Sequence, residues 1–286
     1  MRFRAWCGLL LAGMVAWLLA AGPARAVEFS VQRDLVYSSS GQLMDLYQPL
    51  SSPLGPARPA IVMIHGGCWA WGSKEEYLDY APLFAERGFT VMAINYRLVS
   101  GNKNQWPAQS EDVSEAVWYL RRNAEVLGVN PGKIAAMGMS AGGHLAGWLA
   151  TTERLEPGTG LSSKVQAVIS YAGPWSLVKP MPKGVSGVVL IGCAQGLLGT
   201  WAVPARKQAS PLEYVSATSP PALFIHGTAD VVVPVEQSRQ ANEALLAEGV
   251  PSWITLLPGV GHEYPADDSL WLVPVQRFLT WWLGVE

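Results

Sequence analysis

Short apolar runs alternate with longer amphipathic segments along most of the chain. Near its start, Val31–Tyr37 and Leu43–Tyr47 mix apolar and polar residues and are predicted to pair as antiparallel strands. The later runs are continuously apolar, as in strands that are buried on both faces of a parallel sheet. They are Ala60–Ile64, Thr90–Tyr96, Ile134–Met139, Val165–Tyr171, Ala222–Ile225 and Trp253–Leu257. Together these runs predict a mostly parallel sheet of eight strands.

Helical patterns separate the apolar runs. Ala108–Leu127, for example, carries Val113, Val117 and Leu120 at helical spacing and stops before Gly128. Strands that alternate with helices predict an α/β fold, with right-handed crossovers and helices on both faces of the sheet. The predicted helices are Glu75–Arg87, Ala108–Leu127, Ala141–Thr152, Glu236–Glu248 and Ser269–Trp282.

The segment 173–207 does not follow this alternation. It is rich in Pro, Gly and Val, and Trp175 and Trp201 stand near its two ends. A loop of this length inside a compact domain usually forms a lid or a binding surface. We therefore predict a small lid or substrate-facing insertion at this place.

The first 26 residues have the layout of a secretory signal peptide. Arg2 and Arg4 form a basic start, Gly8–Ala21 is uncharged and mostly apolar, and the small-residue pattern Ala24-Arg25-Ala26 follows. An uncleaved anchor helix is the alternative, but the apolar run is short for a membrane span. We expect cleavage after Ala26, secretion to the periplasm or the medium, and one α/β domain over residues 27–286.

The charge balance excludes two classes of partner. The whole chain has a net charge of −2, and removal of a leader with three arginines and no acid leaves −5. A mildly acidic surface argues against binding to nucleic acid and against a polybasic membrane patch. We expect a small-molecule substrate, no nucleic acid, and no stable membrane insertion after cleavage.

Cys68 and Cys193 are the two cysteines of the predicted mature chain. In an oxidising compartment they could pair, but sequence alone does not place their Cβ atoms. We expect two separate thiols, with a disulfide as the alternative. Two cysteines do not make a metal framework, and no metal site is predicted.

The motif Gly138-Met139-Ser140-Ala141-Gly142 lies between a predicted strand and a predicted helix. This is the context of a nucleophile elbow, a tight turn that lifts a serine hydroxyl clear of the sheet. Glycines on either side of the serine let neighbouring backbone pass closely. Ser140 is therefore the candidate nucleophile, and a chance match to the G-x-S-x-G pattern is the alternative.

A serine hydroxyl needs a base that takes its proton, and the base needs an acid that orients it. His262 lies in a glycine-rich loop after the last predicted strand, and Asp230 follows the strand before that one. The order Ser, Asp, His is the order that accompanies this type of elbow. We predict that Ser140, Asp230 and His262 form a catalytic triad. Supporting or structural roles are expected for His144, His226, Asp112, Asp267 and Asp268.

A third requirement is a set of donors for the oxyanion. His65-Gly66-Gly67-Cys68-Trp69 directly follows a predicted strand, and its glycines expose backbone N–H groups. These can converge with the N–H of Ala141 on one oxygen. We expect the oxyanion hole to contain Gly67 or Cys68, a choice that sequence leaves open, together with Ala141.

These motifs resemble the esterase/lipase branch of the α/β hydrolases, in particular bacterial esterases of the feruloyl and acetyl-xylan (BD-FAE) type. The likeness extends through Asn95-Tyr96-Arg97-Leu98, Ala209-Ser210-Pro211 and the segment from His226 to Asp230. It implies the α/β-hydrolase fold and a two-step acyl transfer from small acyl or aryl esters without metal or cofactor. The chain departs from the commoner HGGG pattern at Cys68, whose thiol could crowd the acyl pocket.

Two other functions stay open at this point. One is an arylformamidase or another amidase, and the other is a catalytically silent binding protein that keeps the fold. Trp69, Trp175 and Trp201 are candidates for an aromatic platform under a sugar or phenolic ring. The alternative is that these tryptophans pack in the core and in the lid.

Overall fold

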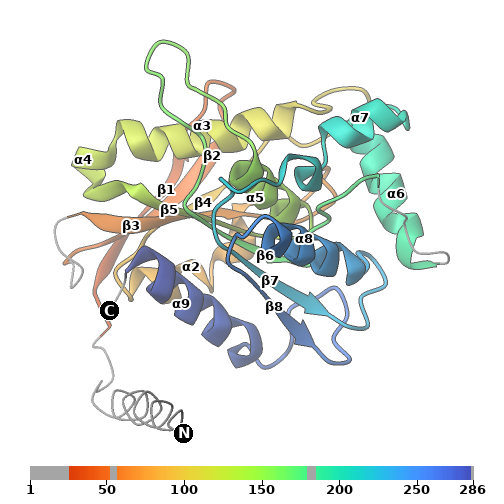
Figure 1. Cartoon of the computed structure of the whole chain (residues 1–286). Helices are drawn as coiled ribbons and strands as arrows, with labels where there is room; N and C mark the ends of the chain where they lie inside the picture. Colours follow the sequence, from red (N-terminus) through yellow and green to blue (C-terminus); the bar gives the residue numbers. More distant parts are fainter. Residues whose placement is uncertain (1–25, 52–56, 179–184, 285–286) are drawn as a thin grey trace, which may run out of the picture.

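The computed structural model describes residues 26–51, 57–178 and 185–284, which contain one eight-stranded sheet (Figure 1). Its strands are β1 (Phe29–Val36), β2 (Leu43–Pro49), β3 (Arg58–Ile64), β4 (Thr90–Ile94), β5 (Val129–Met139), β6 (Ala167–Tyr171), β7 (Ala222–Gly227) and β8 (Ser252–Leu257). Their spatial order is β1-β2-β4-β3-β5-β6-β7-β8. The pairs β1–β2 and β2–β4 are antiparallel, and the remaining pairs are parallel. The predicted mostly parallel sheet is confirmed.

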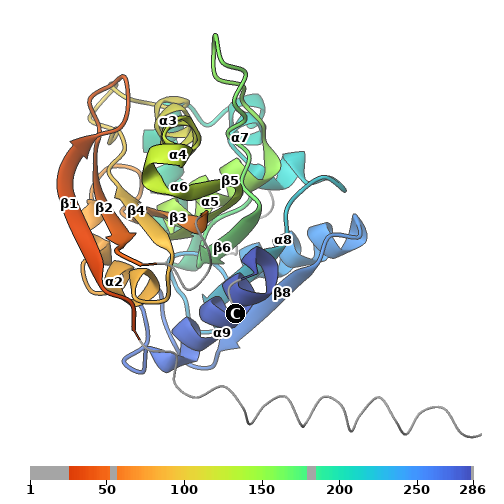
Figure 2. The same cartoon turned by 90° about the vertical axis from the view of Figure 1, so that its left-hand side faces the viewer.

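Helices cover both faces of the sheet, as Figures 1 and 2 show from two directions. They include α2 (Ala81–Ala85), α3 (Ala108–Arg122), α4 (Ala124–Leu127), α5 (Ala141–Thr151), α8 (Glu236–Ala247) and α9 (Ser269–Leu283). Helices α2 and α9 pack on one face, and α3, α5 and α8 pack on the other. The prediction of helices on both faces is confirmed.

The central strand β3 shows why its sequence is apolar throughout. Ala60, Val62 and Ile64 point into the core under α3, α5 and α8, whereas Ile61 and Met63 point into the core under α2 and α9. Successive strand side chains face opposite sides, so a strand with helices on both sides needs apolar residues at every position. The carboxyl ends of β3, β5, β7 and β8 carry the candidate site residues.

The single helix predicted over Glu75–Arg87 is wrong. A short 3-10 helix, η2 (Lys74–Tyr77), is followed by a turn and then by α2. Pro82 has no backbone N–H, and in a continuous helix its ring would clash with the carbonyl of Leu78. This break leaves η2 as a separate turn close to the segment that follows β3.

The helix predicted over Ala108–Leu127 is also divided, into α3 and α4. The division falls at Asn123, where φ is −101° and ψ is 14°. The side chain of Asn123 donates a hydrogen bond of 2.8 Å to the carbonyl of Tyr119. Asparagine side chains that bond nearby backbone in this way compete with helical hydrogen bonds.

The predicted insertion at 173–207 contains two helices, α6 (Val185–Leu198) and α7 (Val203–Gln208), drawn in teal in Figure 1. Leu190, Ala194 and Leu197 of α6 join the core that contains α3 and α5. Residues 179–184 of this insertion lie outside the described residues, and its role as a lid stays a prediction.

The predicted signal peptide, residues 1–26, lies outside the described residues apart from Ala26, so the cleavage site stays a prediction. Within the described ranges, no helix has both the length and the apolar character that crossing a bilayer requires.

Candidate active site

Ser140 occupies a sharp turn between β5, which ends at Met139, and α5, which begins at Ala141. Its backbone is left-handed, with φ at 54° and ψ at −118°. A non-glycine residue with such angles is strained, and the surrounding structure must hold it there. The N–H of Ser140 donates a 2.8 Å hydrogen bond to the carbonyl of Tyr171 at the end of β6. The neighbouring strand therefore helps to fix the turn.

Gly142 lets the elbow approach the neighbouring strand. A Cβ atom built at this position would overlap the carbonyl oxygen of Ile64, the last residue of β3. Only glycine permits so close an approach of the two backbones. The elbow therefore sits directly against the segment that follows β3, which holds the predicted oxyanion donors.

The three residues predicted as a triad lie in one line of hydrogen bonds. The hydroxyl of Ser140 donates to Nε2 of His262 over 2.9 Å. Nδ1–H of His262 donates to Oδ2 of Asp230 over 2.7 Å. Ser140 follows β5, Asp230 follows β7 and His262 follows β8, so residues 122 and 32 positions apart in the chain meet at one edge of the sheet.

The surroundings of Asp230 keep its carboxyl group ionised. Burial opposes the charge, but hydrogen bonds from His226 and His262 and from backbone N–H groups outweigh it and hold the pKa of Asp230 well below its usual range. The N–H groups of Val232 and Val233 donate to Oδ1 over 2.8 and 2.9 Å. The carboxylate can therefore hold the tautomer of His262 that leaves Nε2 free to accept a proton.

His226 is a second imidazole on the same carboxylate. Its Nε2 lies 3.2 Å from Oδ2 of Asp230 and 2.8 Å from the carbonyl of Val233. Both of these neighbours accept hydrogen bonds, so Nε2 carries the proton, and Nδ1 accepts from the hydroxyl of Ser238 over 2.7 Å. Sequence reasoning expected only a supporting contact for His226. The four-residue spacing of His226 and Asp230 at the end of a strand could have indicated that the two side chains are in direct contact.

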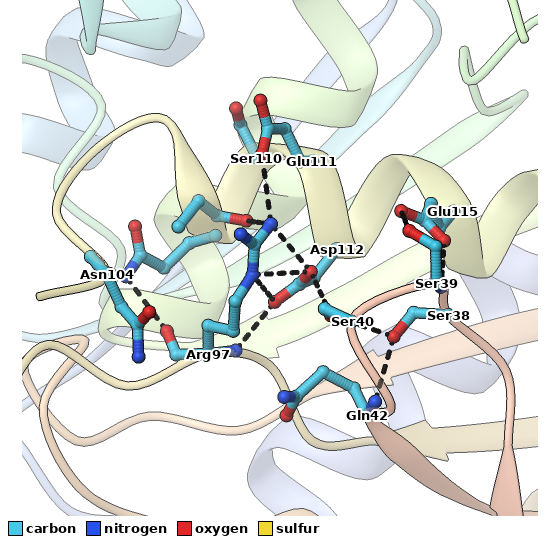
Figure 3. Close-up of polar contacts among 12 residues, drawn as sticks. Ser38, Ser39, Ser40, Gln42, Arg97, Asn104, Ser110, Glu111, Asp112 and Glu115 are labelled. Carbon is cyan, nitrogen blue, oxygen red and sulfur yellow. Dashed lines mark hydrogen bonds and ion pairs between the residues drawn. The ribbon is translucent and has the colours of Figure 1, made fainter. Parts of the chain in front are cut away.

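The competing acids are placed elsewhere. Asp112 is fully buried and accepts hydrogen bonds from the guanidinium and the backbone N–H of Arg97 and from the hydroxyl of Ser40 (Figure 3). Figure 3 shows this ion pair between the start of α3 and the segments after β1 and β4. Asp267 and Asp268 are exposed at the start of α9. The structural role predicted for these three acids agrees with their contacts.

The segment that holds the predicted oxyanion donors lies beside the nucleophile, since a Cβ atom built on Gly66 would lie 3.6 Å from Cβ of Ser140, and Ala141 directly follows Ser140. Gly67, Cys68 and Trp69 all have left-handed φ angles, of 97°, 52° and 58°. Among the described residues, no protein acceptor is paired with the N–H of Gly67, Cys68 or Ala141. These unpaired donors are available to an oxygen that gains negative charge.

Two buried histidines support the oxyanion loop, residues 65–69. His65 stacks on Tyr96 with ring centroids 4.2 Å apart, and His144 meets the ring of Trp69 edge-on at 5.0 Å. Burial lowers the pKa of both imidazoles to about 4, so both are neutral at neutral pH. Nε2–H of His144 donates to the carbonyl of Ala209 over 2.6 Å. The supporting role predicted for His144 fits these contacts.

Cys68 and Cys193 form a disulfide, so the expectation of two separate thiols is wrong. Their Cα atoms are 5.2 Å apart, a separation that a disulfide spans. The bond joins the oxyanion loop to α6, two segments whose proximity local sequence patterns do not reveal. The free thiol that could have crowded an acyl pocket is therefore absent at Cys68.

Loss of this bond should destabilise the fold. The bridge spans 125 positions of sequence, and closing so long a loop restricts the unfolded chain. We expect Cys68→Ser/Cys193→Ser to have a free energy of unfolding lower by roughly 2–4 kcal/mol, as measured by urea unfolding. Wild-type protein reduced with dithiothreitol is the control and should unfold at the same midpoint as the variant. Equal midpoints for the variant and the oxidised wild type would contradict this.

A sequence model of the BD-FAE family matches residues 44–245, which is most of the chain. The matched region contains the oxyanion loop, Ser140 and Asp230. The chain belongs to the BD-FAE family.

Three relatives of this BD-FAE protein in Mycobacterium tuberculosis are named as esterases or as a probable carboxylic ester hydrolase. Esterase LipC of Mycobacterium tuberculosis is 30% identical over 260 residues, which cover 87% of this chain and 63% of LipC. The chain spans between 53% and 63% of the length of LipC and two further relatives from that organism.

Solved esterase structures share the fold of this BD-FAE protein. Esterase Est2 of the planctomycete Thermogutta terrifontis is 29% identical with a TM-score of 0.72, and the match covers 89% of this chain and 92% of Est2. Est2 has also been solved with propionate and with butyrate bound. A truncated carbohydrate esterase from gut microbiota is 26% identical with a TM-score of 0.76, over 92% of this chain and 100% of that one.

The candidate substrate tryptophans differ in their surroundings. Trp69 is 1% exposed and Trp175 is 0% exposed, and Nε1–H of Trp175 donates to the hydroxyl of Ser170 over 3.0 Å. Rings enclosed in this way cannot offer a face to a sugar, so the platform hypothesis is wrong for both. Trp201 is partly buried, with the guanidinium of Arg206 4.5 Å from its ring centroid. A substrate contact for Trp201 stays a prediction.

Proposed function

We propose that this protein hydrolyses carboxylic esters, with Ser140 as nucleophile, His262 as general base and Asp230 as the orienting acid. The observation that carries the proposal is the pair of hydrogen bonds, 2.9 and 2.7 Å, that joins these three side chains. The esterase relatives and the membership of the BD-FAE family support ester hydrolysis as the reaction. A binding protein that had lost its chemistry would have no need to keep all three groups aligned.

In the acylation step, Oγ of Ser140 attacks the ester carbonyl carbon and its proton moves to Nε2 of His262. The negative charge on the resulting tetrahedral oxygen is held by backbone N–H groups of the oxyanion loop and of Ala141. Asp230 stabilises the imidazolium without taking the proton. His262 then gives the proton to the alcohol oxygen, the bond from that oxygen to carbon breaks, and an acyl-enzyme is left.

In the deacylation step, a water molecule takes the place of the alcohol. His262 accepts a proton from the water as its oxygen attacks the acyl carbon, and the same N–H groups hold the second oxyanion. Collapse of this intermediate breaks the bond to Oγ of Ser140, and His262 returns the proton to that oxygen. The products are the carboxylic acid, the alcohol and the unchanged enzyme.

A recess beside the oxyanion loop is the candidate place for a small apolar or aromatic group of the substrate, and neither Ser140 nor His262 lines it. Its volume is about 330 Å³, and it lies between the loop that contains Cys68 and helix α6. Apolar side chains line it, and no charged residue does so among the described part of the chain. Trp71 on its rim is 61% exposed, unlike the buried Trp69 and Trp175. The propionate and butyrate complexes of Est2 agree with short acyl groups.

A panel of substrates tests the proposed reaction. We expect turnover of p-nitrophenyl acetate and butyrate with a kcat/KM in the ordinary enzymatic range, about 10⁴ M⁻¹s⁻¹ or higher. An arylformamide should be turned over more slowly than either ester, because an amide carbonyl is less reactive towards a serine hydroxyl than the carbonyl of an activated ester. Faster turnover of the arylformamide than of either ester would instead support an amidase.

We also propose that residues 1–26 direct export and that the mature protein acts outside the cytoplasm. The layout of the leader supports this. The Cys68–Cys193 disulfide supports it independently, because such bonds persist mainly in oxidising compartments.

A further inference from the structure

Glu76 places a carboxyl group beside the oxyanion loop that the proposed reaction has not used. It lies in the short helix η2, a few residues after the loop in the sequence, and its Oε2 accepts the N–H of Gly66 over 2.9 Å. The second oxygen, Oε1, is shielded from solvent and has no hydrogen-bond partner among the described residues. A carboxylate oxygen left in this way is costly unless an opposite charge faces it.

The carboxyl group of Glu76 is one glycine away from the nucleophile. A Cβ atom built on Gly66 would lie 3.6 Å from Oε2 of Glu76 and also 3.6 Å from Cβ of Ser140. Gly66 therefore separates the two side chains, with its own N–H directed to the carboxylate. Oε2 of Glu76 and Cβ of Ser140 are thus at most about 7 Å apart.

The groups around Glu76 leave its charge without a permanent cationic partner. Within the described chain, no Lys or Arg forms an ion pair with it. On its own turn, Lys74 pairs with Glu75 and Asp45 instead. The other titratable groups that act on Glu76 or are acted on by it are His262, Tyr77, Tyr80, Tyr96 and Tyr264.

Among these groups, only His262 gains a positive charge during the reaction. Burial raises the pKa of Glu76 above its ordinary value, and the N–H of Gly66 and the positive charge of His262 partly oppose that rise. The interaction is reciprocal, because a cation that favours a carboxylate is itself favoured by it. The tyrosines are neutral at neutral pH, since burial raises the pKa of each above its usual value.

We propose that Glu76 is a positioning residue that anchors the oxyanion loop through Gly66 and stabilises the imidazolium of His262 in the transition state. This inference rests on the proposed ester hydrolysis. Asp230 contacts Nδ1 of His262 directly, and Glu76 adds a second negative charge from the side of the oxyanion loop. The two functions of Glu76 are separable, because an amide can replace its hydrogen bond but not its charge.

Glu76→Gln tests the charge alone. Its amide oxygen can still accept the N–H of Gly66, so the loop should keep its position and KM should stay within about twofold. At pH 8 we expect kcat to fall about tenfold, as for a charge removed at this range from a partly buried group. The acid limb of the kcat/KM profile should move to lower pH by about one unit, the shift that corresponds to a tenfold change. At pH values below the acid limb, the kcat/KM values of the wild type and of Glu76→Gln should become equal.

Three further variants separate the effect of the Glu76 charge from other effects of the substitution. Glu75→Gln removes the same charge from the exposed neighbouring residue and should leave kcat and the acid limb unchanged. Glu76→Asp keeps the charge and should keep the acid limb of the wild type. Glu76→Ala loses charge and hydrogen bond together, and its kcat should fall about tenfold further than that of Glu76→Gln.

The inference is overturned if Glu76→Gln keeps the wild-type kcat at pH 8 and the wild-type acid limb. It is equally overturned if Glu76→Asp shifts the limb as far as Glu76→Gln does. Thermal melting of each variant shows whether it is folded. If Glu76→Gln is unfolded, the acid limb of Glu76→Asp tests the inference instead. Turnover by the wild type is measured first, so that failure of the proposed function is seen separately from failure of this inference.

Discussion

Replacing Ser140 with alanine should reduce kcat for p-nitrophenyl acetate by about 10⁶-fold, as the loss of the nucleophile does in comparable triads. The reason is that, in the described part of the chain, only the hydroxyl of Ser140 is hydrogen-bonded to Nε2 of His262, which Asp230 holds from its other side. The backbone N–H groups of the oxyanion hole would remain, and they alone supply the residual rate over water. Initial rates under substrate saturation measure the effect.

Ser269→Ala is a suitable control for this variant, because Ser269 is exposed at the start of α9 and far in sequence from the elbow. It should retain the wild-type rate. Ser140→Ala should melt at a temperature close to that of the wild type, because the positive φ of residue 140 costs alanine and serine about equally. Ser269→Ala should do the same, because Ser269 is exposed. A Ser140→Ala enzyme with more than about one hundredth of the wild-type kcat would exclude Ser140 as the nucleophile.

Replacing Asp230 with asparagine should reduce kcat by about 10⁴-fold. Oδ2 of Asp230 accepts from Nδ1–H of His262 and lies 3.2 Å from Nε2 of His226, so an amide nitrogen there would face two N–H groups. The imidazole of His262 would then favour the tautomer with a proton on Nε2, which cannot accept the proton of Ser140. The charge that stabilises the imidazolium would also be lost. Steady-state kinetics at neutral pH measure the fall.

Asp267→Asn provides the matched control, because it removes the same charge from an exposed residue five positions after His262. Its kcat should equal that of the wild type. Since the pKa of Asp230 is held well below its usual range, Asp230 is ionised at the neutral pH of this assay. A fall of less than tenfold in Asp230→Asn would mean that another group orients the base.

Much of the fold is predictable because the strands are buried on both faces. Ala60–Ile64 and Ala222–Ile225 are continuously apolar, and such runs between helical patterns lead directly to a parallel sheet. The predicted site residues likewise follow strand ends, and the carboxyl ends of parallel strands meet at one edge. The elbow at Ser140 is the strongest local signal, because its glycines are required by backbone contacts.

The parts that could not be predicted depend on contacts between distant segments. The Cys68–Cys193 disulfide requires the packing of α6 beside the oxyanion loop, which no local pattern encodes. Pro82 could have indicated the break before α2, since proline ends a helical pattern. That break matters for function, because the sequence pattern predicts Glu76 within one helix over Glu75–Arg87, whereas it lies in the turn next to Gly66.

The burial of Trp69 and Trp175 could not be read from the sequence either. Both flank segments that carry candidate chemistry, and a tryptophan serves equally well as a packed core residue or as an exposed platform. Only the enclosure of their rings distinguishes the two roles.

Covalent labelling with a fluorophosphonate probe tests the central claim most directly, because such a probe reacts only with a serine that is activated by its neighbours. Intact mass followed by peptide mapping locates the adduct. The account predicts one adduct per chain, on Oγ of Ser140, and none in Ser140→Ala. An adduct on a different serine, or no labelling of folded wild-type protein, would contradict it.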